Sequence, residues 1–258
     1  MRHKTFLLLA AALTFTCACR NTVAEVEIHP IQDNAQPRLM QRALFSEAPD
    51  SLIAELGLEE GIPASVCAFL VKADGKEILF DAANGAHNSQ LVPKLISLEV
   101  KPEDIDHIFI THLHGDHIGG LTADDKAVFP NARLHINTVE LDAWMAMPEE
   151  QTARIRKMIE LYEDRLDKFT LDDTLPCGIK AIEAYGHTPG HTVYQIGTNI
   201  IAGDIMHGTA LQVKYPQYSA RFDMDKTQAV ETRKAVMKTA QEEGLRVYGM
   251  HFPDPYWL

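Results

Sequence analysis

The sequence is poor in cysteine, in internal repeats and in low-complexity linkers. Its 258 residues include four cysteines, and only Cys67 and Cys177 lie outside the first twenty residues. These two are far apart in the chain, so their spacing predicts no disulfide framework, although they could pair in an oxidising compartment. With 46% hydrophobic and 23% charged residues, the composition is that of an ordinary globular protein large enough to bury a core.

Basic residues are also scarce. Lysine and arginine number 24 against 36 aspartates and glutamates, which gives a formal charge of −12. Removal of residues 1–24 would leave 21 basic and 36 acidic residues, a formal charge of −15. A chain with this excess of negative charge repels polyanions, so we do not expect a nucleic-acid partner.

Long apolar runs are absent except at the N-terminus. The stretch "MRHKTFLLLAAALTFTCACR" starts with basic residues and continues with thirteen apolar or small residues, 6–18. This run is too short to span a bilayer and is typical of a secretion signal. We therefore expect residues 1–24 to be a signal peptide, residues 25–258 to form a single domain, and the protein to be exported to the periplasm or beyond.

Two alternatives remain for this N-terminal stretch. Cleavage after "TVA" at Ala24 fits an ordinary signal peptidase, whereas Cys17 or Cys19 would be the lipid-bearing first residue of a membrane-anchored lipoprotein. The residues before either cysteine match a lipobox poorly. Apart from these two kinds of signal peptide, the stretch could instead be a buried first helix of the fold. We expect no transmembrane helix in the mature chain, and the sequence does not indicate an oligomeric state.

Strand-like and helix-like runs alternate along the rest of the chain. We expect a hairpin around Asp74-Gly75 in "ASVCAFLVKADGKEILFDAANG", and single strands at "IDHIFI" and "RLHIN". Two long helices are predicted, "PEEQTARIRKMIELYEDRLDKF" and "DKTQAVETRKAVMKTAQEEG". In the second, Asp225 is the expected N-cap, Gln228 follows three residues later and Gly244 ends the helix. Mixed strands and helices in one chain predict a layered α/β fold.

The segment "THLHGDHIGG" concentrates four metal-ligand side chains in six residues, namely His112, His114, Asp116 and His117. In an extended chain, residues i and i+2 point the same way, so His112 and His114 present two imidazoles side by side. The glycine that follows lets the chain turn into a helix, which directs Asp116 and His117 toward a second point. A single histidine is usually a surface or core residue, but this density of donors favours two neighbouring metal ions.

Further donors follow at the ends of predicted strands. "YGHTPGHTVYQI" contains His187 and His191, "NIIAGDIMHG" contains Asp204, and "RVYGMHFPDP" contains His251. Loops that follow strands are the usual positions of catalytic groups on a rigid sheet. Spacing alone does not choose between His187 and His191.

Together, "THLHGDH", "GHTPGH" and the strand-terminal aspartate resemble the metallo-β-lactamase superfamily, whose signature is H-x-H-x-D-H, over nearly all of the mature chain. The resemblance implies a four-layer αβ/βα sandwich of two mixed β-sheets with helices outside and a dinuclear metal site at one edge. "AGDIMHGTALQ" and "GMHFPDP" resemble the branch that contains methyl parathion hydrolase and related lactonases and esterases.

That resemblance also implies a ligand set. One ion is held by His112, His114 and His187, the other by Asp116, His117 and His251, and Asp204 bridges both. His191 is then a supporting residue. Zinc is the expected metal, with manganese, iron and cobalt as alternatives. A hydroxide shared by the two ions attacks the substrate, while Asp116 or Asp204 orients it or transfers its proton.

The expected function is hydrolysis of a small-molecule ester, lactone or phosphotriester by an exported dinuclear enzyme. One alternative is an N-acyl homoserine lactone lactonase involved in quorum quenching, although typical members have tyrosine where this chain has His207. Another is a non-catalytic zinc-binding exported protein, but a structural zinc site is closed at four ligands. His114 argues against flavodiiron oxidoreductases, which have glutamate there, and Asp204 argues against true β-lactamases. The aromatic residues Tyr215, Tyr218, Phe222, Tyr256 and Trp257 either line a substrate pocket or pack in the core.

Overall fold

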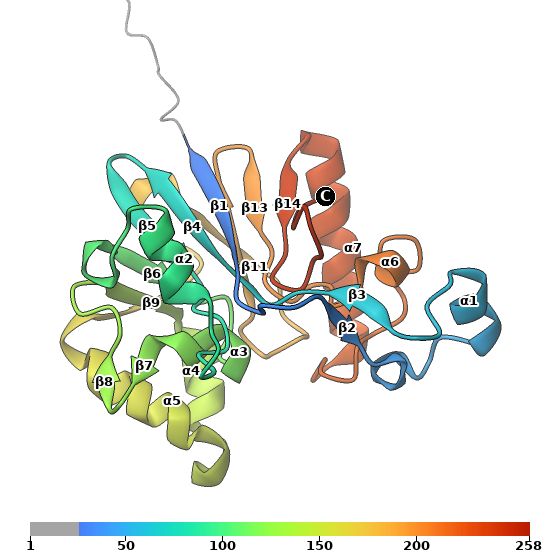
Figure 1. Cartoon of the computed structure of the whole chain (residues 1–258), viewed down its shortest axis with the longest axis horizontal. Helices are drawn as coiled ribbons and strands as arrows, with labels where there is room; N and C mark the ends of the chain where they lie inside the picture. Colours follow the sequence, from blue (N-terminus) through green and yellow to red (C-terminus); the bar gives the residue numbers. More distant parts are fainter. Residues whose placement is uncertain (1–25) are drawn as a thin grey trace, which may run out of the picture.

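The computed structural model describes residues 26–258, in which two β-sheets lie face to face with helices on their outer sides (Figure 1). The larger sheet has the strand order β1-β4-β5-β6-β9-β10, and the smaller has the order β11-β12-β13-β14. Two short pairs, β2-β3 and β7-β8, lie outside these sheets. The expected signal peptide, 1–24, and the candidate lipid-bearing cysteines Cys17 and Cys19 lie outside the described residues.

The strands of the larger sheet are β1 (Glu27–Gln32), β4 (Cys67–Ala73), β5 (Lys76–Phe80), β6 (His107–Phe109), β9 (Arg133–Asn137) and β10 (Leu166–Phe169). Those of the smaller sheet are β11 (Lys180–Glu183), β12 (Thr192–Ile196), β13 (Asn199–Ile201) and β14 (Arg246–Tyr248). The short pairs are β2 (Arg38–Met40) with β3 (Ile62–Ala64), and β7 (Thr122–Ala123) with β8 (Lys126–Ala127). The predicted hairpin is confirmed, and its turn residues Asp74 and Gly75 have φ of 52° and 71°, the left-handed region that a two-residue turn requires. The strands predicted at "IDHIFI" and "RLHIN" are β6 and β9.

The helices are α1 (Asp50–Glu55), α2 (Leu91–Ser97), α3 (Gly115–Ile118), α4 (Thr138–Met145), α5 (Glu149–Tyr162), α6 (Thr209–Gln212) and α7 (Lys226–Glu243). Helix α7 has the predicted ends: the side chain of Asp225 accepts a hydrogen bond from the backbone N–H of Gln228, and Gly244 is left-handed with φ 65°. Within residues 26–258, no helix is both long enough and apolar enough to cross a bilayer.

One helix prediction was wrong over residues 163–169. The helix expected to run to the end of "DRLDKF" stops at Tyr162, and Leu166–Phe169 form β10 instead. These residues pair in parallel with β9, and the side chain of Arg133 on β9 donates a 2.6 Å hydrogen bond to Asp167. Cross-strand pairing of this kind depends on a distant segment and overrides a local helical pattern.

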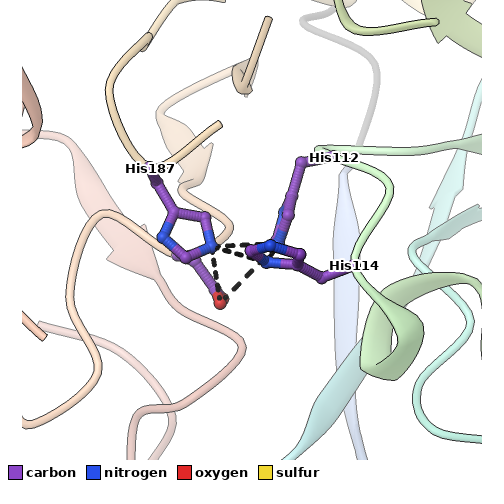
Figure 2. Close-up of side chains that lie close together, drawn as sticks. His112, His114 and His187 are labelled. Atoms are coloured by element: carbon purple, nitrogen blue, oxygen red, sulfur yellow. Dashed lines mark hydrogen bonds and ion pairs between the residues drawn. The ribbon is translucent and has the colours of Figure 1, made fainter. Parts of the chain in front are cut away.

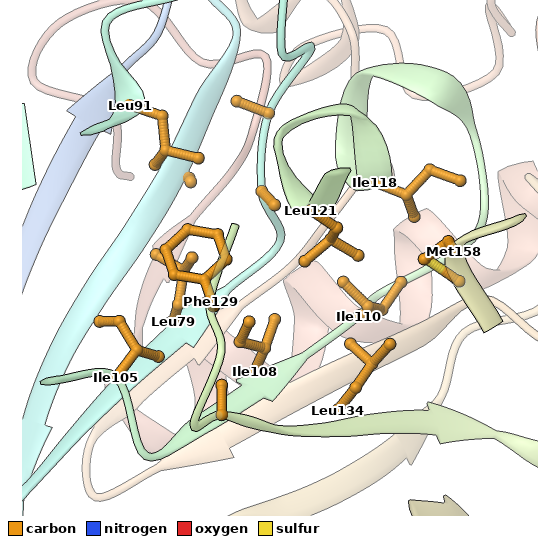
Figure 3. Packing of buried hydrophobic residues seen from close by; sticks show 14 of the residues in the cluster. Leu79, Leu91, Ile105, Ile108, Ile110, Ile118, Leu121, Phe129, Leu134 and Met158 are labelled. Atoms are coloured by element: carbon orange, nitrogen blue, oxygen red, sulfur yellow. The ribbon is translucent and has the colours of Figure 1, made fainter. Parts of the chain in front are cut away.

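Three apolar layers hold the sheets and helices together. Leu79, Ile108 and Leu134 from the larger sheet pack against Leu91 of α2 and Met158 of α5 (Figure 3). Between the sheets, the rings of Phe80, Phe109 and Tyr194 lie 5.4 to 5.5 Å apart. Under α7, Val236 and Ala240 pack on Val193, Ile200 and Val247 of the smaller sheet. Helix, sheet, sheet and helix therefore form four layers, which confirms the αβ/βα sandwich.

Residues 38–64, here called the β2–β3 arm, extend from one side of the sandwich and include α1 (Figure 1). The arm has its own apolar cluster, in which Met40, Phe45 and Ile62 pack together with Leu211 of α6. This packing fixes the arm against the loop that follows β13, so that its first strand has a defined position beside that loop.

Cys67 and Cys177 are both free thiols in the described structure. Cys67 is buried between the sheets, and burial raises the pKa of its thiol to about 12. Its side chain lies 3.2 Å from the hydroxyl of Ser65. A thiol with so high a pKa is a small apolar core group at neutral pH and not a nucleophile.

A pair of histidines, the half-buried His107 at the start of β6 and the buried His135 in the middle of β9, leads to a prediction about acid stability. His107 Nδ1 lies 3.0 Å from His135 Nε2, and His135 stacks on Phe109. Burial, together with the nearby His107 and Arg133 and against the opposing effect of Asp167, lowers the pKa of His135 to about 4. At acidic pH the folded state therefore binds fewer protons than the unfolded state. The stability that comes from the neutral His135 is present at neutral pH and is lost as pH falls from 6.5 toward 4.

We expect His135→Gln, whose new side chain cannot titrate, to reduce the dependence of the unfolding free energy on pH. Between pH 7.5 and 4.5 the wild type should lose about 2 kcal/mol more unfolding free energy than the variant. Urea unfolding of both proteins at the two pH values measures the difference. Equal losses would mean that His135 is not kept neutral by burial.

Candidate metal centre

The predicted donors come together at the edge where the strands of both sheets end. β6 leads into the loop with His112 and His114, and α3 then begins directly after His114. Asp204 follows β13 and His251 follows β14 in the second sheet. Gly203, which precedes Asp204, has φ 54°, and a Cβ there would lie 2.5 Å from an imidazole nitrogen, so only glycine fits.

The first group of donors consists of His112, His114, His187 and Asp204. Figure 2 shows the three imidazoles directed toward one another from two different loops. His187 Nε2 lies 3.2 Å from His112 Nε2 and 2.9 Å from His114 Nδ1, and the latter two nitrogens are 3.0 Å apart. Asp204 Oδ2 lies 3.4 Å from His187 Nε2. These four ligand atoms all lie within 4.8 Å of one another, close enough to surround a single ion.

The second group consists of Asp116, His117 and His251, again within 4.8 Å of one another. Asp116 Oδ2 lies 3.6 Å from His251 Nε2, and its other oxygen lies 3.9 Å from His117 Nε2. Asp204 reaches this group as well, because its Oδ1 is 3.2 Å from His117 Nε2 and its Oδ2 is 3.1 Å from His251 Nε2. One carboxylate thus lies between both groups.

Hydrogen bonds on the outer side of the imidazoles determine which nitrogen carries the proton. His117 Nδ1 lies 2.6 Å from Asp81 Oδ2 and donates to that carboxylate. The hydroxyl of Thr111 also donates to Asp81, at 2.7 Å, so its oxygen is free to accept from His112 Nδ1 at 3.1 Å. Both imidazoles therefore have a lone pair on Nε2 when neutral.

The same arrangement recurs on the other two loops. His187 Nδ1 donates to Asp223 Oδ1 at 2.9 Å, and Asp223 is in turn held by Arg233, whose guanidinium is fully buried and lies 3.2 Å away. His251 Nδ1 donates to the backbone carbonyl of Ser65 at 2.8 Å. Their Nε2 atoms also carry lone pairs directed inward.

This convergence of lone pairs fits a pair of divalent cations. The Nε2 atoms of His112 and His187 face each other without a proton between them, which is repulsive unless a cation lies there. The buried Nε2 of His117 and Oδ1 of Asp204 have no hydrogen-bond partner within the described chain. Buried polar atoms are normally satisfied, so these orphans are best explained as metal ligands.

The pKa shifts agree with this charge distribution. Burial lowers the pKa of His112 well below its usual range and that of His114 to about 3, so both stay neutral, as metal ligands must. Burial opposes the charged form of His117, but Asp204 and Asp81 outweigh it and raise its pKa. Burial also opposes ionisation of Asp204, yet its histidine neighbours hold its pKa well below the ordinary value. The centre therefore attracts positive charge.

His191 has a different role from His187. Its Nε2 accepts a 3.0 Å hydrogen bond from the backbone N–H of Asp204, which positions the carboxylate from behind. Among residues 26–258, the groups of converging ligand atoms contain His187 and not His191.

We expect His187→Ala to lose metal and most hydrolytic activity. His191→Ala should instead keep its metal and lose a modest factor in activity or some stability, because only a positioning bond is removed. Elemental analysis and thermal unfolding of both variants measure this contrast. The reverse ranking would show that the ligand is His191.

Glu140, a buried residue of α4, joins the two histidine loops and was not among the predicted site residues. One of its oxygens accepts from the Leu113 backbone N–H and from Trp144 Nε1, at 2.9 and 2.7 Å. The other accepts from the Thr188 hydroxyl and the Gly190 N–H, at 2.7 and 2.9 Å. Nothing in the local sequence distinguishes this glutamate from an exposed helix residue. Asp81, by contrast, directly follows an apolar strand and could have been suspected.

A hollow of about 250 Å³ opens over the centre. It is lined by His114, Gly115, Asp116, Asp204, His207 and His251 and by Arg38, Met40 and Phe222. Of the five aromatic residues weighed from the sequence, only Phe222 lines this hollow. Tyr215 and Tyr218 pack on the cluster of the β2–β3 arm, Tyr256 packs between the sheets, and Trp257 lies under the guanidinium of Arg246. The hollow therefore has Phe222 as the one Phe, Tyr or Trp among its lining residues.

Comparison with known proteins gives a consistent result. Residues 62–237 match the family model described as the metallo-beta-lactamase superfamily. Among solved structures, the hydrolase AbOPH of the beta lactamase superfamily is 28% identical with a TM-score of 0.80, covering 90% of this chain and 89% of that one. AidC, a dizinc quorum-quenching lactonase in complex with a product, has a TM-score of 0.82 at 23% identity, covering 91% and 90%.

Curated relatives match shorter segments. Ribonuclease Z of Nanoarchaeum equitans (strain Kin4-M) is 32% identical over 108 residues, which is 42% of this chain and 28% of the relative. The uncharacterized protein YobT of Bacillus subtilis (strain 168) is 31% identical over 149 residues, 54% of this chain and 61% of the relative. The alignments therefore span less than two thirds of either relative.

Proposed function

The chain belongs to the metallo-beta-lactamase superfamily and is a metal-dependent hydrolase, and from this premise we propose that it uses two divalent metal ions to hydrolyse small esters, lactones or phosphotriesters. The proposed ligands are His112, His114 and His187 for one ion, Asp116, His117 and His251 for the other, and Asp204 for both. The observation that carries the proposal is the position of Asp204, whose carboxylate reaches both donor groups at 3.1 to 3.4 Å.

Two divalent ions, when bound, supply a water of lowered pKa and polarise the scissile carbonyl or phosphoryl oxygen. The chain's own residues provide the proton transfer. The side chain of Asp116 is 32% exposed and faces the hollow, whereas that of Asp204 is 3% exposed. Burial acts to raise the pKa of Asp116, but the nearby His117 and His251 outweigh it, and the pKa lies below its ordinary value. Asp116 is therefore ionised, and it accepts a proton from the attacking water and returns it to the leaving oxygen.

The hollow supports a small substrate. Its volume of about 250 Å³ is near the lower end for small-molecule pockets, and Met40 and Phe222 give it apolar walls. The relationship to ribonuclease Z raises nucleic acid as a substrate, but an excess of 36 acidic over 24 basic residues disfavours a polyanion. N-acyl homoserine lactones remain one substrate class within the proposal, since AidC is described as a lactonase on the same fold.

The experiment is an activity panel on the purified protein with p-nitrophenyl esters, N-acyl homoserine lactones and paraoxon-type triesters. We expect about two ions per chain by elemental analysis, turnover of at least one class, loss of turnover with a chelator and recovery when zinc is returned. RNA is added to the panel as a competing substrate class, and turnover of RNA alone would instead favour a nuclease. A fully metallated protein that turns over none of these would favour a non-catalytic zinc-binding protein.

We also propose that the metal is zinc and that the protein is exported. Histidine and aspartate ligands suit zinc, and the basic and then apolar start of the sequence supports a signal peptide. Cell fractionation with mass analysis of the mature N-terminus tests export and distinguishes cleavage after Ala24 from lipidation at Cys17 or Cys19.

A further inference from the structure

Arg38, on the first strand of the β2–β3 arm, lines the hollow over the metal centre. Among the residues that the structure describes, it is the only lysine or arginine to do so. Phe222 and Met40 line the same hollow, whose remaining members are the donors, His207 and Gly115. We propose that Arg38 is an anion-binding subsite and that the substrate is an ester or lactone that carries a carboxylate near its scissile bond. The substrate class rests on the proposed function, whereas the anion subsite itself can be tested by binding.

Arg38 has no competing partner. No carboxylate within residues 26–258 forms an ion pair with it, whereas Arg42, Arg133 and Arg233 pair with Asp50, Asp167 and Asp223. Asp33 lines a neighbouring surface hollow with Arg38, but its carboxylate already accepts from the backbone N–H groups of Gln90 and Leu91. In a protein with a formal charge of −12, a guanidinium left unpaired at the mouth of the site is available to a ligand.

The backbone places Arg38 firmly beside the centre. In the β2–β3 pair, Arg38 lies opposite Ala64, and the next residue, Ser65, accepts the 2.8 Å hydrogen bond from His251. The Ser65 hydroxyl also donates to the carbonyl of Phe252 at 2.6 Å. The arm is therefore tied directly to the loop that holds a proposed metal ligand. Because i and i+2 share a face of a strand, Arg38 and the buried Met40 line the hollow together.

Three sides of the hollow, namely Arg38, the metal centre and Phe222, together define the proposed substrate. Guanidinium binds carboxylate through two parallel hydrogen bonds, which sets both distance and orientation. Two bound divalent ions carry more positive charge than Asp116 and Asp204, so the loaded hollow attracts anions although the protein surface repels them. An ester whose scissile carbonyl lies at the metal centre and whose carboxylate meets Arg38 leaves its apolar part against Phe222.

Binding of carboxylates of increasing chain length to the metal-loaded protein tests the subsite independently of catalysis. Succinate, glutarate and adipate are compared by titration calorimetry with butyrate, pentanoate and hexanoate, since each pair shares one carboxylate that the metal centre can bind. We expect at least one dicarboxylate to bind about tenfold more tightly than its monocarboxylate, as a charge-assisted bidentate contact would give. Arg38→Gln should abolish this ratio, and Arg38→Lys should restore part of it.

Arg133→Gln is the matched control, because it removes the same charge where β9 begins, and it should keep the wild-type ratio. Metal content and melting temperature of Arg38→Gln establish that the variant is folded and loaded. With 4-nitrophenyl esters, the preference for mono-glutarate over butyrate should fall about tenfold in Arg38→Gln. An unchanged dicarboxylate ratio in Arg38→Gln would overturn the subsite. Loss of the ratio in a protein that hydrolyses no ester, lactone or phosphotriester would support the subsite while refuting the proposed function.

Discussion

Asp204→Asn is expected to give a folded protein that holds less than one ion per chain and has lost about 10³-fold in kcat/KM. The carboxylate reaches both donor groups, at 3.2 Å from His117, 3.4 Å from His187 and 3.1 Å from His251. An amide cannot supply the negative charge that two neighbouring cations require, and losing the metal pair removes several kcal/mol of transition-state stabilisation. The fold should survive because the amide N–H groups of asparagine can donate to the Nε2 lone pairs of His117 or His251.

His251→Ala is the companion variant, since it removes a ligand from one donor group only. It leaves the second ion with Asp116, His117 and the shared carboxylate, so about one tightly bound ion should remain and most hydrolysis should be lost. Elemental analysis, circular dichroism and steady-state kinetics on both variants measure the contrast. If Asp204→Asn retained two ions and wild-type turnover, the assignment of a shared carboxylate would be wrong. The same result for His251→Ala would make His251 a bystander.

The sequence predicted the part of the site that is local in the chain. The four donors of "THLHGDH" lie within six residues, and a strand followed by a helix start brings them to two adjacent points, as the structure has it. Asp204 and His251 were suggested by their positions after apolar runs, but only the pairing of β13 with β14 places them side by side. Their proximity is a property of the sheet, so predicting it required either the structure or a family resemblance.

Two of the supporting residues, Asp223 and Arg233, could not have been predicted in this way. Asp223 lies 2.9 Å from His187 although 36 residues separate them, and it depends on Arg233 of α7. The buried face of α7 contains Ala229, Val236 and Ala240 but also Arg233, and a fully buried arginine cannot be recognised from hydrophobic periodicity. Burying a guanidinium is costly unless it is paired, and the pairing exists only in the folded chain. Arg38 is likewise an ordinary charged residue until β3 brings it to the hollow.

Glu140→Gln is expected to lower the unfolding free energy by about 2–4 kcal/mol and the metal affinity by about 10- to 100-fold, despite its nearly identical shape. Four donors converge on the carboxylate, two on each oxygen. A glutamine amide turns its NH₂ group toward one of these pairs in either orientation, and the backbone N–H of Leu113 or Gly190 cannot reverse its polarity. The loop with His112 and His114 and the loop with His187 should then separate. Urea unfolding and metal titration measure the effect, with Glu150→Gln on the exposed side of α5 as the control. Wild-type stability and metal affinity in Glu140→Gln would show that the loops are held by their own packing and not by this carboxylate.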